Sequence, residues 1–364
     1  MQIQAQNGLD LILDRLREIL QRMPDWVLAG IRKDTRLDSG GIDVLCTVEY
    51  PEGQVELIFE YKKDGLPGII RRAASQLRSY KNSFAESEVL PVFAAPYVTD
   101  EGLDVCREEG IGCIDEAGNC LLPLPGAYVE IRGKKNPRPV SRPIKSIFSP
   151  KSSRILRVLL SDVGRWWQVQ ELAVEAMVSN GLVSRIKQRL LDEEFVIEHE
   201  RRIQVRSPGK VLDAWVENYR YKRNQLSEYF SLDDVSTVEK RIAGWCDANN
   251  IQYALGLFTA AARLAPHVRM NKAFIFVDAD SKAVAQTLQL KPVSSGSNVA
   301  LLRPYDQGVF YNGSVYGGLN VVSHVQAYID LKSYRGRGEE AADFLMEQVL
   351  EKQWAQNQNM GHAR

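Results

Sequence analysis

The segment IFEYKKDGLPGIIRRAASQLRSY, residues 58–80, decides how the N-terminal part of the chain folds. Its apolar run ends in Glu60 and Lys62, which is typical of a strand, in which alternate side chains share a face. Pro67 favours a helix start, because the first helical turn does not need its missing N–H. Gln76 and Tyr80, four residues apart, then lie on one helical face. The segment therefore predicts a strand and a helix that both carry polar side chains.

A second strand is predicted for GIDVLCTVEY, residues 41–50, joined to the first by the turn PEGQ, residues 51–54. With this turn centred on Glu52 and Gly53, Asp43 is expected opposite Lys62, and opposed residues share a sheet face. Asp43 and Lys62 then converge with Glu60. A register slip of one residue would turn Asp43 to the other face.

Two convergent carboxylates favour a hard cation, so Mg²⁺ or Mn²⁺ is the cofactor expected at Asp43 and Glu60 if these residues form a site. Such an ion activates a bound water and neutralises phosphodiester charge, and the ammonium group of Lys62 would steady the attacking water. A simpler interpretation stays open. Glu60 and Lys62 then form a solvent-facing pair, and Tyr80 packs on the sheet from an ordinary surface helix.

The order of Asp43, Glu60-x-Lys62 and Gln76-x-x-x-Tyr80 resembles the PD-(D/E)xK restriction-endonuclease-like superfamily over residues ~9–130. This resemblance implies that Asp43 and Glu60 bind metal, that Lys62 activates the nucleophile, and that Gln76 and Tyr80 support the site. It leaves open whether the domain is an active metal-dependent DNA endonuclease or a binding scaffold. From periodicity, the element order expected here is α-β-β-α-β-α-β, a mixed α/β domain ending near residue 132.

A basic segment follows this domain. No acid occurs between Arg132 and Arg157, and four prolines, Pro137, Pro139, Pro143 and Pro150, favour an extended linker over residues 133–152.

Residues 153–208 predict helix, helix, turn, helix and hairpin, the order of a winged helix-turn-helix. Its third helix is expected to begin at Ser179 and to enter a major groove. Polar residues expected to face DNA are Gln168, Ser179, Asn180, Ser184, Arg185, Lys187 and Gln188, with Arg201 and Arg202 on the wing. A protein–protein module without DNA is the alternative, favoured slightly by the acids at residues 192–194.

Three further motifs resemble the AbiEi-type antitoxin and transcriptional-regulator family of type IV toxin–antitoxin systems. They are KVLDAWVENYRYKRN at 210–224, VQAYIDLKSYRGRGEEAADFL at 325–345 and GIGCIDEAGNCLL at 110–122. The resemblance implies repression of the protein's own operon through the winged helix. It also implies counteraction of a nucleotidyltransferase-type toxin without a tight complex. The chain departs from simpler members of the family, because its winged helix is central.

The overall composition limits the functions that the chain can have. The 46 basic and 46 acidic residues cancel, so any affinity for nucleic acid must come from local patches. No apolar run approaches the ~18 residues of a membrane span, and the N-terminus indicates an amphipathic helix, so a cytoplasmic protein without a membrane partner is expected.

We therefore expect an α/β multidomain protein with a restriction-endonuclease-like domain (1–132), the linker (133–152), a central winged helix (153–208) and a C-terminal α/β antitoxin-like domain (209–356). The leading interpretation is a regulator that binds double-stranded DNA at its own promoter. One alternative is a magnesium-dependent DNA nuclease of a defence or mobile-element system, targeted by the winged helix. Another is an oligomerisation scaffold.

Overall fold

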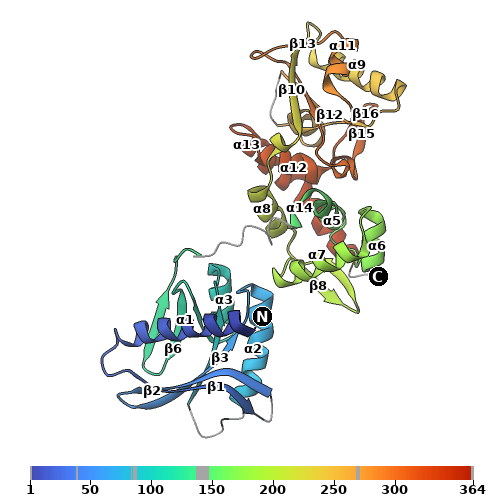
Figure 1. Ribbon diagram of the computed structural model, residues 1–364. Helices are drawn as coiled ribbons and strands as arrows, with labels where there is room; N and C mark the ends of the chain where they lie inside the picture. The colour runs from blue at the N-terminus through green and yellow to red at the C-terminus, as the bar shows by residue number, and fades with distance from the viewer. Residues whose placement is uncertain are drawn as a thin grey trace. The chain divides into compact units, whose positions relative to one another are not determined.

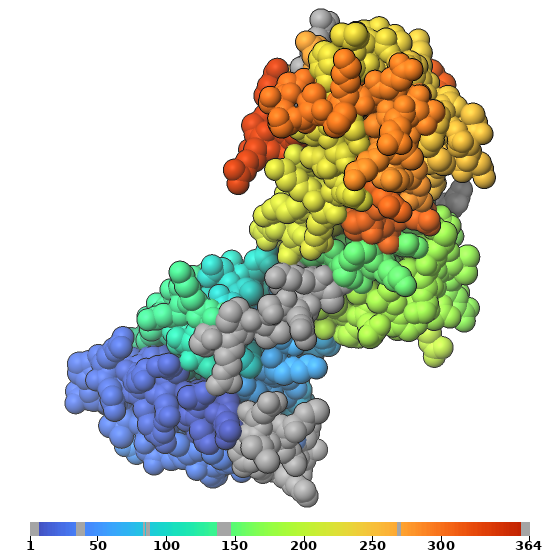
Figure 2. Space-filling view, turned by 45° about the horizontal axis from the view of Figure 1, so that its top comes forward, coloured from blue at the N-terminus to red at the C-terminus, as the bar shows by residue number. Residues whose placement is uncertain are grey.

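The computed structural model describes residues 2–37, 40–82, 84, 88–136, 147–267 and 271–361. The chain divides into two compact units, which are described separately below: an N-terminal unit, Met1–Val140 with Asp192–Glu194, and a C-terminal unit, Ser141–Leu191 with Phe195–Arg364 (Figures 1 and 2). Residues 137–146, which make up much of the expected basic linker, lie outside the described residues. None of the helices in the described ranges combines the length and apolar character that a membrane span requires.

The N-terminal unit is built on a seven-stranded mixed sheet in which the strands follow one another in chain order. Strands β3 and β4, and β4 and β5, pair in parallel, and the other neighbours pair antiparallel. The strands are β1 (Val27–Leu37), β2 (Gly40–Tyr50), β3 (Gly53–Tyr61), β4 (Val89–Ala95), β5 (Gly112–Asp115), β6 (Cys120–Leu124) and β7 (Ala127–Ile131).

Helices cover both faces of this sheet. Helix α1 (Gln2–Leu20) buries Ile12 and Leu16 against one face. Helices α2 (Pro67–Lys81) and α3 (Asp100–Glu108) bury Ile70, Leu77 and Leu103 against the other. The mixed α/β class is as expected, but the expected element order was incomplete: strand β7 was not foreseen, and neither was strand β1. Strand β1 lies at the sheet edge and carries charged residues such as Arg32 and Lys33, so it lacks an apolar alternation.

The C-terminal unit begins with three helices and a two-stranded hairpin. These are α5 (Pro150–Ser161), α6 (Val169–Glu175), α7 (Asn180–Asp192), β8 (Val196–His199) and β9 (Arg202–Val205). Between α5 and α6, Trp167 forms an antiparallel bridge to Ile203 of β9. The hairpin therefore gains a third, one-residue strand. Helix α5 begins at Pro150, earlier than the expected start at 153, and buried Ile147 and Phe148 precede it.

A second seven-stranded sheet forms the rest of this unit, in the order β13-β10-β14-β12-β11-β16-β15. Its strands are β10 (Gln225–Phe230), β11 (Tyr253–Leu255), β12 (Ala273–Val277), β13 (Lys291–Pro292), β14 (Val299–Arg303), β15 (Ser314–Tyr316) and β16 (Leu319–Val321). The accompanying helices are α8 (Pro208–Asn218), α9 (Val235–Ala248), α10 (Leu257–Leu264), α11 (Ser281–Thr287), α12 (His324–Lys332), α13 (Gly338–Leu345) and α14 (Glu351–Gly361), with shorter turns η1 (Tyr221–Arg223), η2 (Gln307–Phe310) and η3 (Met346–Leu350).

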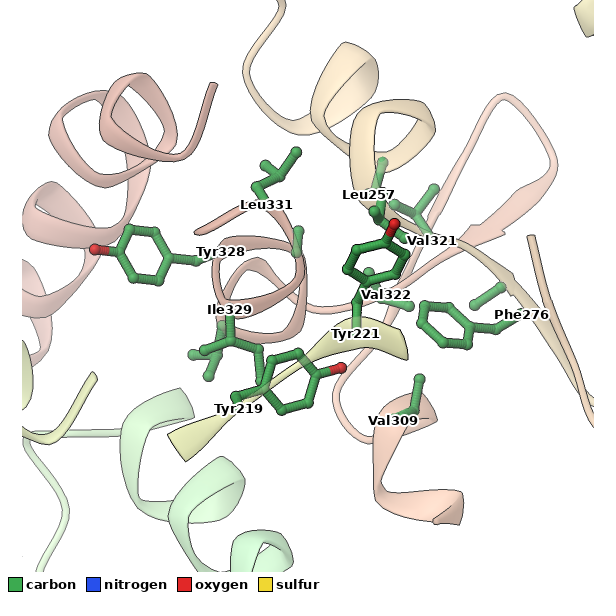
Figure 3. Close-up of a cluster of buried hydrophobic side chains, with 14 of the residues drawn as sticks. Tyr219, Tyr221, Leu257, Phe276, Val309, Val321, Val322, Tyr328, Ile329 and Leu331 are labelled. Carbon is green, nitrogen blue, oxygen red and sulfur yellow. The ribbon is translucent and has the colours of Figure 1, made fainter. Parts of the chain in front are cut away.

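One hydrophobic core runs from α5 to α14 through the whole C-terminal unit. In Figure 3, side chains of α12, including Ile329 and Leu331, lie with Tyr219 and Tyr221 in this core. The Trp354 indole of α14 donates a hydrogen bond to the Leu160 carbonyl of α5. The helical part of this unit and its α/β part thus share one interior.

A buried polar network also joins these two parts. The Arg157 guanidinium of α5 is inaccessible to solvent and donates to the Gln326 Oε1 of α12 and to the Ser153 hydroxyl. The Gln326 amide donates to the Tyr219 hydroxyl, which donates to Asp330 Oδ1 at 2.6 Å. Asp330 Oδ2 is buried without a hydrogen-bond partner among the described residues, whereas the bonds from Arg157 to Gln326 tie α5 to α12.

Candidate functional site

Strands β2 and β3 place Asp43 and Glu60 on the same face of the N-terminal sheet. Val44 pairs with Phe59 and Leu45 with Ile58, so the same register continued by one residue puts Asp43 opposite Glu60. Leu45 and Ile58 both face α2, and residues two apart on a strand share a face. The expected register, with Asp43 opposite Lys62, was wrong by two residues, because the turn is formed by Pro51 and Glu52. Because side chains alternate between the two faces of a sheet, a register error of two residues leaves Asp43 on the expected face.

Glu60 is a buried carboxylate with one oxygen unused. Its side chain accepts a hydrogen bond from Lys62 Nζ at 2.5 Å through Oε1, whereas the buried Oε2 has no hydrogen-bond partner among the described residues. Burial raises the pKa of Glu60, the nearby Asp43 charge raises it further, and the Lys62 and Gln76 side chains oppose the shift. An incompletely satisfied carboxylate of this kind suits a role in binding a cation or a proton.

Asp43 is held by the backbone, since its Oδ2 accepts the Tyr61 N–H at 2.8 Å. On α2, the Gln76 amide donates to the Tyr80 hydroxyl, and Tyr80 is buried in the core beneath the helix. The structure therefore brings Asp43, Glu60, Lys62 and Gln76 together. Among the described residues, Tyr80 contacts this group through its hydrogen bond with Gln76.

These residues fit a small hard cation in part. The unpaired Glu60 Oε2 and the neighbouring Asp43 carboxylate supply oxygen ligands, which Mg²⁺ and Mn²⁺ prefer. No cluster of three or more His, Cys, Asp or Glu side chains suited to a metal occurs among the residues that the structure describes. An ion here would thus take two protein carboxylates and complete its shell with water or phosphate oxygens, as Mg²⁺ commonly does.

The segment 110–122 contains β5, most of β6 and the turn between them, and Asp115 holds this turn. Asp115 is fully buried and accepts hydrogen bonds from the Val98 and Asn119 backbone N–H groups and from the Asn119 side chain. Gly118 has φ +92, a conformation that residues with a Cβ rarely adopt. These contacts hold the β5–β6 turn and leave the Asp115 carboxylate satisfied.

The outward side of α7 is polar and accessible. Ser179 lies at its start, where its hydroxyl accepts the Leu182 N–H at 3.3 Å. The other exposed polar residues expected to contact DNA from this helix are Asn180, Ser184, Arg185 and Gln188. Lys187 differs, because its ammonium group is 2.5 Å from Glu198 Oε1 on β8 and its side chain is only 17% exposed. Its positive charge is therefore paired with an acid of the β8–β9 hairpin.

The tip of the β8–β9 hairpin is a two-residue turn. Glu200 and Arg201 have φ +48 and +64, the left-handed values of a type I′ turn. Arg201 and Arg202 are both exposed there. Gln168 lies at the start of α6, where its backbone N–H donates to the Glu171 carboxylate. The bridge between Trp167 and Ile203 was not foreseen, because a one-residue strand leaves no periodic signal.

Residues 204–351 match the family model described as "Transcriptional regulator, AbiEi antitoxin, Type IV TA system". The resemblance of this chain to the AbiEi family, expected from its motifs, is thereby confirmed. The motifs at 210–224 and 325–345 both fall within the matched region.

Solved structures are similar to only a small part of this chain. One is titled "Structure of EndoMS-dsDNA2 complex", with 17% identity, 28% of this chain and 43% of that chain covered, and a TM-score of 0.20. Another is a repair endonuclease from Pyrococcus abyssi, with 15% identity, 28% and 45% coverage, and a TM-score of 0.21. The matched part spans less than half of each of these chains. No curated protein sequence matches this chain.

Proposed function

We propose that this protein is a DNA-binding transcriptional regulator that uses residues 147–206 as a winged helix-turn-helix. The observation that carries the proposal is the hairpin β8–β9 packed after three helices, with Trp167 paired to Ile203 as a third strand. A strand between the first two helices and a hairpin after the third is the order of a winged helix. The third helix of such a unit inserts into the major groove.

The chemistry of α7 suits base and phosphate contacts. Asn180, Ser184 and Gln188 can donate and accept hydrogen bonds at base edges, and Arg185 can bond guanine or phosphate. Arg185 is exposed and has no ion-pair partner among the described residues, so its guanidinium is available. Exposed Arg201 and Arg202 on the hairpin would contact phosphates beside the groove.

The family match supports a more specific role. An AbiEi-type regulator would bind its own promoter, repress its operon and counteract a nucleotidyltransferase-type toxin without forming a tight complex with it. The matched region begins at residue 204, within β9, and continues through the α/β part of the unit. The winged helix would then recognise DNA, and the α/β part would carry the antitoxin activity.

Binding of the full-length protein to double-stranded DNA tests this function. Fluorescence anisotropy would compare the DNA upstream of the gene with a shuffled duplex of equal length and composition. We expect tighter binding to the upstream duplex by about 10³ or more at physiological salt, as specific regulators show. Equal affinity for both duplexes would refute promoter recognition.

A second function is proposed for the N-terminal unit: metal-dependent cleavage of DNA. The orphaned Glu60 Oε2 beside Asp43 is the observation that favours it. A bound divalent cation would supply an activated water and neutralise phosphate charge. Asp43 and Glu60 would hold this cation, Lys62 would orient the attacking water through its ammonium group, and the Gln76 amide would position the Glu60 carboxylate.

A further inference from the structure

A basic cavity of about 840 Å³ lies in the C-terminal unit. Two segments distant in sequence form it. One runs from the end of α8 into η1, residues 216–222, and the other runs from the end of α12 to Arg335. The cavity uses none of the α7 or hairpin residues that the proposed DNA-binding surface needs. A volume of this size is typical of small-molecule sites, which span roughly 300–1,000 Å³.

Positive charge dominates the cavity lining, although the chain as a whole is neutral. Four cationic side chains line it, and Glu217 is the acid among the lining residues. The cationic residues are Arg220, Lys222, Lys332 and Arg335. Like charges repel unless acids or a bound anion compensate them, so this concentration of cations needs an explanation.

Most of this charge is not neutralised within the protein. Exposed Lys222 and Arg335 have no ion-pair partner among the described residues. The Arg220 Nη1 donates to the last carbonyls of α8, including that of Val216 at 3.2 Å, and these carbonyls are uncharged. Lys332 differs, because its ammonium group is 2.6 Å from Asp343 Oδ1. Three guanidinium or ammonium groups therefore remain for a ligand.

The floor of the cavity is rigid. Tyr221 and Tyr334 pack with ring centroids 5.4 Å apart, and Tyr334 packs edge-on against Phe258. The Tyr221 N–H donates to the Ser333 hydroxyl at 3.0 Å, which ties η1 to the end of α12. Tyr221 lies within the buried cluster of Figure 3. A binding site on such a floor is organised before the ligand arrives, which favours affinity.

From these observations we infer that the cavity binds a phosphate-bearing small polyanion of nucleotide size. Arginine recognises phosphate through paired, charge-assisted hydrogen bonds, and lysine adds a strong point charge. A polyphosphate chain could engage Arg220, Lys222 and Arg335 together, which a singly charged anion could not. The inference does not depend on the winged helix or on the metal site.

Isothermal titration calorimetry on the full-length protein tests this inference, with inorganic tripolyphosphate, ATP and adenosine as ligands. We expect tripolyphosphate and ATP to bind with one site per chain and adenosine to give no heat of binding. Equal affinities for tripolyphosphate and ATP would identify the phosphate chain as the recognised group. Tighter binding of ATP than of tripolyphosphate would identify a nucleotide as the ligand. The double variant Lys222→Glu, Arg335→Glu should weaken binding at least about tenfold, since each lost charge-assisted bond contributes that much or more.

The matched control is Arg223→Glu, Arg337→Glu, which makes the same charge change at neighbouring exposed positions that do not line the cavity. We expect it to bind within about threefold of the parent protein, because solvent screens charges at a distance. All four side chains are exposed, so circular dichroism should show native folding in both variants. Absence of tripolyphosphate and ATP binding, or equal losses in both variants, would overturn the inference. Binding of duplex DNA without binding of tripolyphosphate or ATP would also overturn the inference.

Discussion

Trp167 and Ile203 exchange two backbone hydrogen bonds, at 2.8 and 2.9 Å, and so attach the segment before α6 to the hairpin β8–β9. This pairing sets the hairpin beside the start of α6, and both residues are buried in the core of the C-terminal unit. The same hairpin carries Glu198, which reaches Lys187 on α7. The hairpin and the proposed recognition helix are therefore linked by charge as well as by packing.

The link between Lys187 and Glu198 leads to a prediction about DNA affinity. Glu198→Gln removes an acid from the proposed DNA-facing surface and frees the Lys187 ammonium group for phosphate. We expect tighter binding to the upstream duplex and a steeper dependence of affinity on salt, by about one unit in the logarithmic slope. Anisotropy titrations at several salt concentrations measure both. Exposed Glu347→Gln, on η3, is the control and should change neither.

The proposed metal site predicts a thermal shift that depends on Glu60. In the wild type, Mg²⁺ or Mn²⁺ at about 100 times its Kd should stabilise the protein by about 2.7 kcal/mol and raise Tm accordingly. Glu60→Gln should abolish this shift, because it removes a proposed ligand, whereas Glu49→Gln at an exposed position of β2 should preserve it. Scanning fluorimetry with and without the ion is the measurement. A metal-dependent shift that survives in Glu60→Gln would place any metal elsewhere.

The raised pKa of Glu60 leads to a prediction about how the stability of the Glu60→Gln variant depends on pH. Since burial raises the pKa of Glu60, the folded protein binds a proton that the unfolded chain has released, and stability falls as pH rises through the folded pKa. Metal-free Glu60→Gln should therefore melt higher than the wild type at pH 8 and lose this advantage in acid. Melting curves in chelator from pH 4 to 8 check the trend, and a lower Tm for the variant at pH 8 would contradict it.

Asp330 predicts a second pH effect, in the C-terminal unit. Burial raises its pKa to about 7, although the Tyr219 hydroxyl donates to it and Arg157 lies nearby. The raised value means that its contribution to stability declines as pH rises from about 4 to about 7 and stays low above that. Asp330→Asn should raise Tm by about 3 °C at pH 8 and by less at pH 5. Parallel curves for both proteins across this range would argue against ionisation of Asp330.

Arg157 should be the most damaging position to truncate in this network. Arg157→Ala removes a fully buried charge and leaves Gln326 without its donor, which is expected to destabilise the C-terminal unit by about 3 kcal/mol. Lys151→Ala, at an exposed position on the same helix, should change stability by less than about 0.5 kcal/mol. Urea denaturation followed by circular dichroism compares the two, and similar midpoints would show that the network contributes little.

Much of the candidate site was predictable because its signals are local. The face shared by Asp43 and Glu60 follows from strand alternation, and it tolerates the two-residue register error at the Pro51–Glu52 turn. The α7 residues that face solvent follow from its apolar stripe of Val183, Ile186 and Leu190. In both cases the periodicity of a single strand or helix was sufficient to predict which side chains share a face.

Long-range relationships were not predictable in this way. The pairing of Lys187 with Glu198 depends on how the hairpin packs, and Arg157 appears in the sequence as an ordinary surface cation of an amphipathic helix. The basic cavity joins Lys222 to Arg335 across more than a hundred residues, although the runs RYKR and KSYRGR were visible as separate motifs. Only the folded chain shows that these groups meet.

The central claim, that α7 and the hairpin bind promoter DNA, is tested most directly by Arg185→Ala combined with Arg202→Ala. The measurement is the affinity of the full-length protein for its upstream duplex as a function of salt, with Lys240→Ala, Lys282→Ala as a charge-matched control at exposed sites on or beside α9 and α11. We predict that the first variant binds at least about tenfold more weakly and that its logarithmic salt slope falls by about two units, while the control matches the wild type. Unchanged affinity and slope in Arg185→Ala, Arg202→Ala would contradict the account.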